Sequence, residues 1–388
     1  MDYKTGIEAL TVFYSLKSDP TVDALHSFLC APSMDGYARF VSLLYEENGG
    51  DLGKKILRLV CESENICIKL AGSDRALPPH LEKRLREELD FLQALASLSC
   101  DQLKELLSID LPLPDYVCGG VDIREEYLKR LQNVHTCGYG IYAENVMFRL
   151  DGNAQIVPVG HPDPIALSDL VDYDRERQAV LDNTDAFLAG KPAANVLLTG
   201  DVGTGKSSTV KAVVNARAEN GLRIIEIRKD QFSFLPDVIA ALQENPLRFI
   251  LFIDDLSFTG DDDSFNALKA ALEGSVAAKS ENVVIYATSN RRHIVKERAS
   301  DREGDDLHIS ETMQEQISLS DRFGLHISFY KPDKKTFLHI VSHLAKQYGI
   351  TAGEDELSAG AERFALERGG RSARLAKQYV DILRSKQE

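Results

Sequence analysis

The chain has 388 residues, which is too long for one ordinary hydrophobic core, so we expect two or three domains. Hydrophobic residues make up 44% of it and charged residues 27%, and no apolar run approaches the roughly 20 residues that a membrane-spanning helix needs. The formal net charge of -15, spread over the whole chain, would repel nucleic acid, so a nucleic-acid partner is possible but not favoured.

The first residues, MDYKTGIEAL, have neither the basic start and apolar stretch of an export signal nor the Arg-rich pattern of an organelle signal. We therefore expect a cytoplasmic location. All six cysteines lie in the first 140 positions and form no CxxC pair. This pattern indicates reduced and mostly buried thiols rather than a zinc site or disulfides.

Residues 3–133 show the pattern of successive amphipathic helices. Leu81, Leu85, Leu89 and Leu92, for example, recur at a spacing that places side chains on one face of a helix. Turn-forming residues separate the helices at 31–33, 48–50, 77–79 and 111–114. The sequence thus predicts an all-helical N-terminal domain over residues 1–155, which we interpret as a partner-binding module without catalytic residues.

Alternating apolar and polar residues around Asp151-Gly152-Asn153 predict a hairpin near 145–159. A linker follows it, and residues 172–189 form a predicted helix. Helical patterns then alternate with five short apolar runs, at 195–200, 222–228, 249–254, 282–289 and 325–330.

Strands that alternate with helices form a parallel sheet through right-handed crossovers. We therefore expect an α/β nucleotide-binding core over residues 156–332. The remaining residues, 333–388, have amphipathic helical patterns only and predict a helical C-terminal lid.

The segment GDVGTGKSS matches the phosphate-binding (Walker A) pattern G-x-x-x-x-G-K-[ST] and lies between a predicted strand and a predicted helix. Glycines there let backbone N–H groups point at a polyphosphate, at the positive end of a helix. Lys206 would add a cation for the β- and γ-phosphates, and the Ser207 hydroxyl would complete a Mg²⁺ shell. The expected nucleotide-binding residues of this loop are Gly200, Gly203, Thr204, Gly205, Lys206, Ser207 and Ser208.

Two carboxylates, Asp254 and Asp255, end the apolar run FILFID and resemble a Walker B element. Ligands of open α/β sheets bind at the carboxyl ends of the strands, where these side chains would lie. We expect Asp254 to bind Mg²⁺ directly or through water. Asp255 would then orient or deprotonate the attacking water.

With these motifs the chain resembles the AAA+ ATPase superfamily, and more closely an uncharacterised bacterial family of ATP-binding proteins within it that shares the segments DDLSF and ATSNRRH. The resemblance covers about residues 160–386 and implies ATP as the nucleotide and a homo-oligomeric assembly. It also implies that Asn290 is a polar sensor between the Mg²⁺ carboxylate and the γ-phosphate.

The same resemblance suggests roles for two arginines. Arg322, in SLSDRFG, matches the arginine finger that completes a neighbouring subunit's site. Arg374, in GGRSARLAKQYV, is the better match for the lid arginine that reaches the nucleotide, and Arg371 is the second. A surface ion pair for Arg322 and a solvated basic helix face for the lid arginines are the structural alternatives.

Two features depart from the superfamily pattern. Asp255 stands where most members have Glu, and the shorter side chain would slow hydrolysis or make the site a switch. Residues 291–319 form a longer connection than the fold needs, which we interpret as an exposed interaction insert.

The leading hypothesis is an ATPase that uses Mg-ATP to remodel or load a protein or nucleoprotein partner held by the N-terminal domain. A nucleotide-gated switch with little turnover is the first alternative, because of Asp255. A helicase-loader-like, DNA-associated ATPase and a small-molecule kinase are further alternatives.

Overall fold

The structure is a computed structural model, and it describes residues 2–107, 112–259, 263–273, 280–290, 295–296 and 322–386. Two compact units make up the chain. The helical unit comprises the residues up to Asn145 together with Glu244–Leu247. The sheet unit comprises Val146–Gln243 and the residues from Arg248 onward. Within the described part of the chain, none of the helices combines the length and the apolar character needed to cross a membrane.

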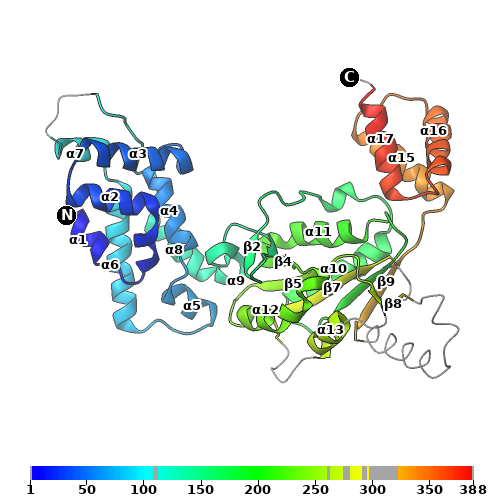
Figure 1. Ribbon diagram of the computed structural model, residues 1–388, viewed down its shortest axis with the longest axis horizontal. Coiled ribbons are helices and arrows are strands. Elements are labelled where there is room, and N and C mark those ends of the chain that lie inside the picture. Colours follow the sequence, from blue (N-terminus) through cyan, green and yellow to red (C-terminus); the bar gives the residue numbers. More distant parts are fainter. Residues whose placement is uncertain are drawn as a thin grey trace. The chain divides into compact units, whose positions relative to one another are not determined.

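Helices build the described N-terminal part, as predicted (Figure 1), and one isolated β-bridge joins Asp51 to Val117. Their bounds are α1 (Tyr3–Glu8), α2 (Pro20–Cys30), α3 (Met34–Asn48), α4 (Leu52–Glu62), α5 (Ile66–Gly72), α6 (Pro79–Ala96), α7 (Cys100–Glu105), α8 (Ile123–Gln132) and α9 (Val134–Cys137), with a short 3-10 helix η1 (Tyr14–Ser18). The side chains that cap the first turn of α2, α3, α4, α5, α7 and α8 are Asp19, Ser33, Asp51, Asn65, Ser99 and Asp122.

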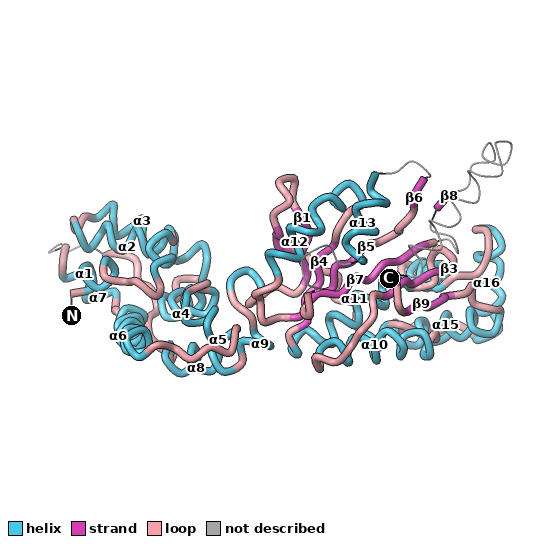
Figure 2. Tube along the Cα trace, turned by 90° about the horizontal axis from the view of Figure 1, so that it is seen from below, coloured by secondary structure: helices cyan, strands magenta, loops and turns pink. Residues whose placement is uncertain are grey.

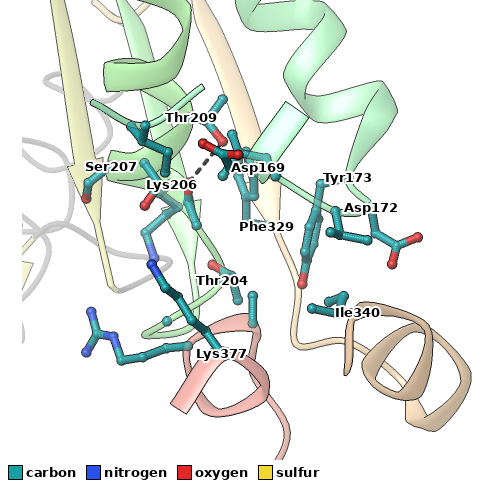
Figure 3. Close-up of a pocket in the computed structure, with 18 of the residues that line it drawn as sticks. Asp169, Asp172, Tyr173, Thr204, Lys206, Ser207, Thr209, Phe329, Ile340 and Lys377 are labelled. Carbon is teal, nitrogen blue, oxygen red and sulfur yellow. Dashed lines mark hydrogen bonds between the residues drawn. The ribbon is translucent and has the colours of Figure 1, made fainter. Parts of the chain in front are cut away.

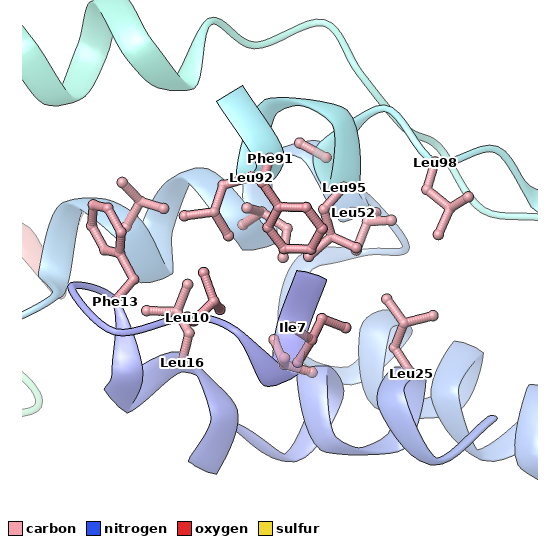
Figure 4. Packing of buried hydrophobic residues seen from close by; sticks show 14 of the residues in the cluster. Ile7, Leu10, Phe13, Leu16, Leu25, Leu52, Phe91, Leu92, Leu95 and Leu98 are labelled. Carbon is pink, nitrogen blue, oxygen red and sulfur yellow. The ribbon is translucent and has the colours of Figure 1, made fainter. Parts of the chain in front are cut away.

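The core of the helical unit joins the first helices to α4 and α6. Figure 4 shows Ile7 of α1, Leu25 of α2 and Leu52 of α4 around Phe91 and Leu95 of α6. All five side chains are buried. The amphipathic pattern of the sequence therefore marks the inward faces of these helices correctly.

The six cysteines are free, but most of them are not buried, so the prediction of buried thiols is wrong. Only Cys67 is buried, and Cys30 is exposed. The reason is their position: Cys30 and Cys137 are the last residues of α2 and α9, and Cys100 is the first of α7. Helix ends lie near the surface, where a thiol stays accessible.

A seven-stranded sheet forms the sheet unit, in the order β2-β1-β4-β5-β7-β3-β9. The strands are β1 (Met147–Leu150), β2 (Ile156–Pro158), β3 (Val196–Gly200), β4 (Leu222–Glu226), β5 (Arg248–Ile253), β7 (Val283–Ser289) and β9 (Leu325–Phe329). All neighbours are parallel except β1 and β2. Two further short strands, β6 (Phe258–Thr259) and β8 (Val295–Lys296), pair with each other.

The hairpin near 145–159 forms as β1 and β2, but its place differs from the expected one. Because β1 pairs in parallel with β4, the hairpin extends the sheet rather than the helical unit. The sheet unit thus begins at Val146 and not at residue 156.

Helices cover both faces of the sheet (Figures 1 and 2). On one face lie α10 (Asp174–Leu188) and α11 (Lys206–Arg217), and on the other α12 (Leu235–Leu242) and α13 (Asp263–Glu273). Val180 and Val213 of the first pair pack on Ile224 and Ile250 of the sheet. Burial on both faces explains why these strands read as continuous apolar runs, and the predicted α/β class is confirmed.

Three helices follow the sheet, α15 (Lys334–Gln347), α16 (Glu354–Glu367) and α17 (Ala373–Arg384). Phe337 and Ile340 of α15 pack with Ala361 of α16 and Val380 of α17 in a core of their own. This bundle is the helical lid that the sequence predicts, and we call it the lid from here on.

Candidate functional site

A glycine-rich loop connects β3 to α11, as the motif predicts. The bend at its start needs glycine, because a Cβ on Gly200 would lie 1.9 Å from the backbone oxygen of Phe329 on the neighbouring strand. Gly205, directly before α11, has a φ of +94°, which side chains other than glycine rarely allow. The loop therefore makes a tight turn from the end of β3 into the first turn of α11.

Lys206 begins that helix and is almost enclosed, with 5% of its surface exposed. Its ammonium donates to the backbone oxygens of Gly200 and Asp201 at 2.9 and 2.8 Å, and to Oδ1 of Asn290 at 3.0 Å. Burial lowers the pKa of Lys206 from its ordinary value, while nearby carboxylates, among them Asp254, act in the opposite direction. An added anion would stabilise this buried ammonium strongly, because its hydrogen-bond partners are neutral.

Asp254, directly after β5, is hydrogen-bonded to residues of α11 and β7. Its Oδ1 accepts hydrogen bonds of 2.6 Å from the hydroxyl of Ser207 and of 2.6 Å from the hydroxyl of Thr288. Ser207 belongs to α11, and Thr288 lies near the end of β7, next to β5. A carboxylate beside a hydroxyl at the phosphate loop is an oxygen set that suits Mg²⁺.

Asp255 has a left-handed backbone with a φ of +54°, which is uncommon for a residue other than glycine. Its N–H donates to the Thr288 hydroxyl at 3.0 Å, and its Oδ1 accepts from Nδ2 of Asn290 at 2.7 Å. Asn290 thus bridges Lys206 and Asp255, accepting from one and donating to the other. The structure brings together all of these residues that the sequence proposed, and Thr288 is an additional one.

The opposite wall of the pocket comes from the segment before α10. Asp172 and Tyr173 both have positive φ values, of 62° and 60°, so the helix begins at Asp174 and not at residue 172 as predicted. The Tyr173 ring stacks at a tilt on Phe329, with centroids 5.3 Å apart, and its hydroxyl donates to the backbone oxygen of Tyr330 at 2.6 Å. Burial raises the pKa of Tyr173 to about 12, so the hydroxyl stays protonated at neutral pH.

The lid completes a cavity of about 980 Å³. Figure 3 shows Ile340 of α15 and Lys377 of α17 on the same pocket as Lys206 and Tyr173. Arg374 also lines it, and the backbone N–H of Arg374 donates to the backbone oxygen of Gly203 at 3.1 Å. Cationic groups therefore approach the glycine-rich loop from two elements, and apolar side chains of the lid close the far end.

Sequence reasoning missed several of these wall residues. Thr288 had a weak signal, as a polar residue near the end of a buried strand and two positions before Asn290. Tyr173 and Ile340 had none, because an aromatic or aliphatic side chain before or within a helix is ordinary. Their part in the pocket arises only from the packing of the lid.

The two remaining arginine candidates lie elsewhere. Arg371 forms a bidentate ion pair with Glu362, at 2.8 and 2.7 Å, and does not line the pocket. Arg322 precedes β9. Because Leu325 at the start of β9 pairs with Val196 at the start of β3, Arg322 lies toward the end of the strands opposite the loop. Arg322 does not line this chain's own pocket. Of the predicted insert at 291–319, all but residues 295–296 lies outside the described residues.

Comparison with known proteins gives one family match. A family model described as "Protein of unknown function (DUF815)" matches residues 143–387, more than half of the chain. No curated protein matches the sequence.

Among solved structures, a mutant of RuvB from Thermotoga maritima is similar at 16% identity over 58% of this chain and 67% of its own, with a TM-score of 0.41. A second structure of RuvB from Thermotoga maritima, described as a Holliday junction branch migration motor, is similar at 12% identity. That match covers 56% of this chain and 72% of the other, with a TM-score of 0.35.

Proposed function

The chain belongs to the DUF815 family, and from this premise we propose that its pocket binds Mg-ATP and hydrolyses it. One observation carries the proposal: Lys206, Ser207, Asp254, Asp255 and Asn290 are joined by hydrogen bonds around one pocket at the carboxyl ends of the strands. Cations, oxygen ligands and a further carboxylate at a helix N-terminus are the parts that phosphoryl transfer to water requires.

The glycine-rich loop and Lys206 would hold the polyphosphate. The three hydrogen bonds of the enclosed ammonium go to neutral oxygens, and phosphate oxygens would take their place. Ser207 and Asp254 would hold Mg²⁺, which supplies charge neutralisation on the β- and γ-phosphates when bound. Thr288 would keep Asp254 oriented through its 2.6 Å hydrogen bond.

Asp255 would orient the attacking water and accept its proton. Asn290 donates to this carboxylate at 2.7 Å, which holds the carboxylate in place at the pocket. Since the Asn290 amide also contacts Lys206, it would sense the γ-phosphate that Lys206 binds. Arg374, from the lid, would add positive charge on the side facing the loop.

The test is ATP turnover by the purified full chain with Mg²⁺. We expect Lys206→Ala to abolish hydrolysis and to weaken ATP binding, because the mutation removes the buried cation. Lys211→Ala is the matched control, since Lys211 is on the same helix but does not line the pocket. Equal turnover in wild type and Lys206→Ala would refute the assignment.

A switch with little turnover is the second candidate, and Asp255 motivates it. Its side chain is one methylene shorter than Glu and is already engaged by Asn290. If the switch is correct, wild type binds ATP without measurable hydrolysis and Asp255→Glu gains turnover. A pull-down with Asp255→Asn held on ATP would then identify a protein or nucleoprotein partner, which we propose binds the helical unit.

We further propose that the chain acts as a homo-oligomer in the cytoplasm, with Arg322 completing the site of a neighbouring subunit. Its backbone position before β9 and its absence from the lining of its own pocket support this role. In that case, turnover per chain rises with protein concentration in wild type. Mixing Arg322→Ala with Lys206→Ala chains should restore activity, because one chain supplies Lys206 and the other supplies Arg322. If the mixture stays inactive, Arg322 does not act on a neighbouring subunit.

A further inference from the structure

A mixed cluster of metal-binding side chains lies in the helical unit. Glu8 is the last residue of α1, and His26 and Cys30 are one turn apart on α2. Nε2 of His26 lies 3.2 Å from Oε1 of Glu8 and 3.6 Å from Sγ of Cys30. The carboxylate oxygen, ring nitrogen and sulfur all lie within 4.8 Å of one another.

Two of these separations match edges of a coordination tetrahedron. Bond lengths of about 2.0–2.1 Å for nitrogen and oxygen and about 2.3 Å for sulfur give ligand-to-ligand edges of roughly 3.3–3.6 Å around zinc. The two measured separations, 3.2 and 3.6 Å, are close to these values before any metal draws the ligands in. Both contacts involve Nε2, so this ring nitrogen is the ligand atom that lies near both of the others.

We propose that Glu8, His26 and Cys30 form a Zn²⁺ site with water as the fourth ligand. A thiolate, an imidazole and a carboxylate form a set that favours zinc over Mg²⁺ or Ca²⁺, which prefer oxygen ligands alone. Glu8 and Cys30 are exposed, which leaves room for the water. This chemistry separates the site from the all-oxygen set at Ser207 and Asp254.

The local structure places two of the three ligands, His26 and Cys30, side by side without the metal. The i to i+4 spacing on α2 puts His26 and Cys30 on one face, and Asp19 caps this helix by accepting from Thr21 and Val22. The ammonium of Lys17 donates to the backbone oxygen of Glu8 and not to its carboxylate.

The ion would link α1 to α2. Helix α1 has six residues and no side-chain cap, so little within it holds it. Ile7, next to Glu8, is part of the core of the helical unit, so a metal ion bound at Glu8 would also stabilise the packing of Ile7. Metal binding at this site therefore stabilises the fold of the helical unit.

The experiment uses the full chain, reduced and freed of metal with a chelator, and titrated with Co²⁺ and then Zn²⁺. We expect one Co²⁺ to give tetrahedral d–d absorption and a thiolate-to-cobalt charge-transfer band, both displaced by Zn²⁺. Cys30→Ser should lose the charge-transfer band, His26→Ala should lose tight binding, and Glu8→Gln should weaken it roughly tenfold or more. Cys100→Ser, which changes another partly exposed cysteine, should leave the spectrum intact.

Thermal unfolding gives a second readout. Zn²⁺ should raise the Tm of wild type and of Cys100→Ser but not of Cys30→Ser, whose fold is checked by circular dichroism. Metal binding without a thiolate band, or a band that survives in Cys30→Ser, would overturn the proposal.

Discussion

The hydroxyl of Tyr173 donates a 2.6 Å hydrogen bond to the backbone oxygen of Tyr330, where β9 gives way to the lid. One residue earlier, the carboxylate of Asp172 lies 3.0 Å from Nδ1 of His339 on α15. The segment before α10 thus contacts both the connection that leads into the lid and the lid itself. Its two consecutive left-handed residues persist because these contacts and the Phe329 ring hold them.

Tyr173→Phe should weaken ATP binding about fivefold, because the lost hydrogen bond, worth about 1 kcal/mol, positions the lid over the pocket. Isothermal titration calorimetry measures the change. Tyr330→Phe is the control, since Tyr330 accepts through its backbone and keeps that contact. If all three proteins bind ATP equally, Tyr173 has no part in positioning the lid.

The two lid arginines predict opposite outcomes. Arg374→Ala should reduce ATP affinity or turnover about tenfold or more, because it removes a cation from the pocket. Arg371→Ala should change neither, because that guanidinium is paired with Glu362 outside the pocket. The Kd for ATP and the kcat of each variant distinguish the two arginines. A larger loss of affinity or turnover in Arg371→Ala would show that Arg371, and not Arg374, serves the nucleotide site.

A pair of carboxyl groups predicts a pH-dependent stability. Burial, followed by a hydrogen bond with Glu144, raises the pKa of Glu62 from 4.5 to about 7, against the opposing effect of Arg58. The folded chain thus holds a proton that the unfolded chain releases. The stabilisation is complete below pH 4.5 and is lost as the pH rises through about 7.

Because Glu62 is partly exposed, we expect a loss of about 1 kcal/mol across this range. Urea unfolding from roughly pH 5 to roughly pH 8 should show this decline in wild type and a flatter profile in Glu62→Gln. Glu105→Gln, an exposed residue of the same unit, should keep the wild-type profile. A parallel decline in Glu62→Gln would rule out Glu62 as the source.

Glu88 is a buried carboxylate, and its removal should be costly. Its oxygens accept from the backbone N–H groups of Thr11, Val12 and Phe13. Glu88→Ala would leave these donors without their acceptor and should lower the free energy of unfolding by about 3 kcal/mol. Glu87→Ala, at the neighbouring exposed position, should change stability little.

The same residue predicts acid sensitivity. Burial raises the pKa of Glu88, but hydrogen bonds from Thr11, Phe13 and Val12 outweigh it and lower the pKa below 4.5. The stabilisation is therefore present above pH 4.5 and lost as the pH falls through the lowered value. Acid unfolding monitored by circular dichroism should show a smaller decline in Glu88→Gln than in wild type.

The sequence by itself determined the parallel core of the sheet, the phosphate loop and the pair Asp254 and Asp255. These features are local: a glycine pattern, a buried apolar run and the carboxylates that end it can be read within a few residues. The five core strands and the lid also follow from periodicity, since both faces of the sheet and one face of each lid helix are buried.

Only the tertiary structure decided which side chains surround the loop. Tyr173, Thr288 and Ile340 come from elements far apart in the chain, and no local pattern states that they meet. The same holds for the cluster of Glu8, His26 and Cys30, whose members lie on two helices. Packing of elements in three dimensions creates such sites, because contact depends on the crossing of helices and strands and not on distance along the chain.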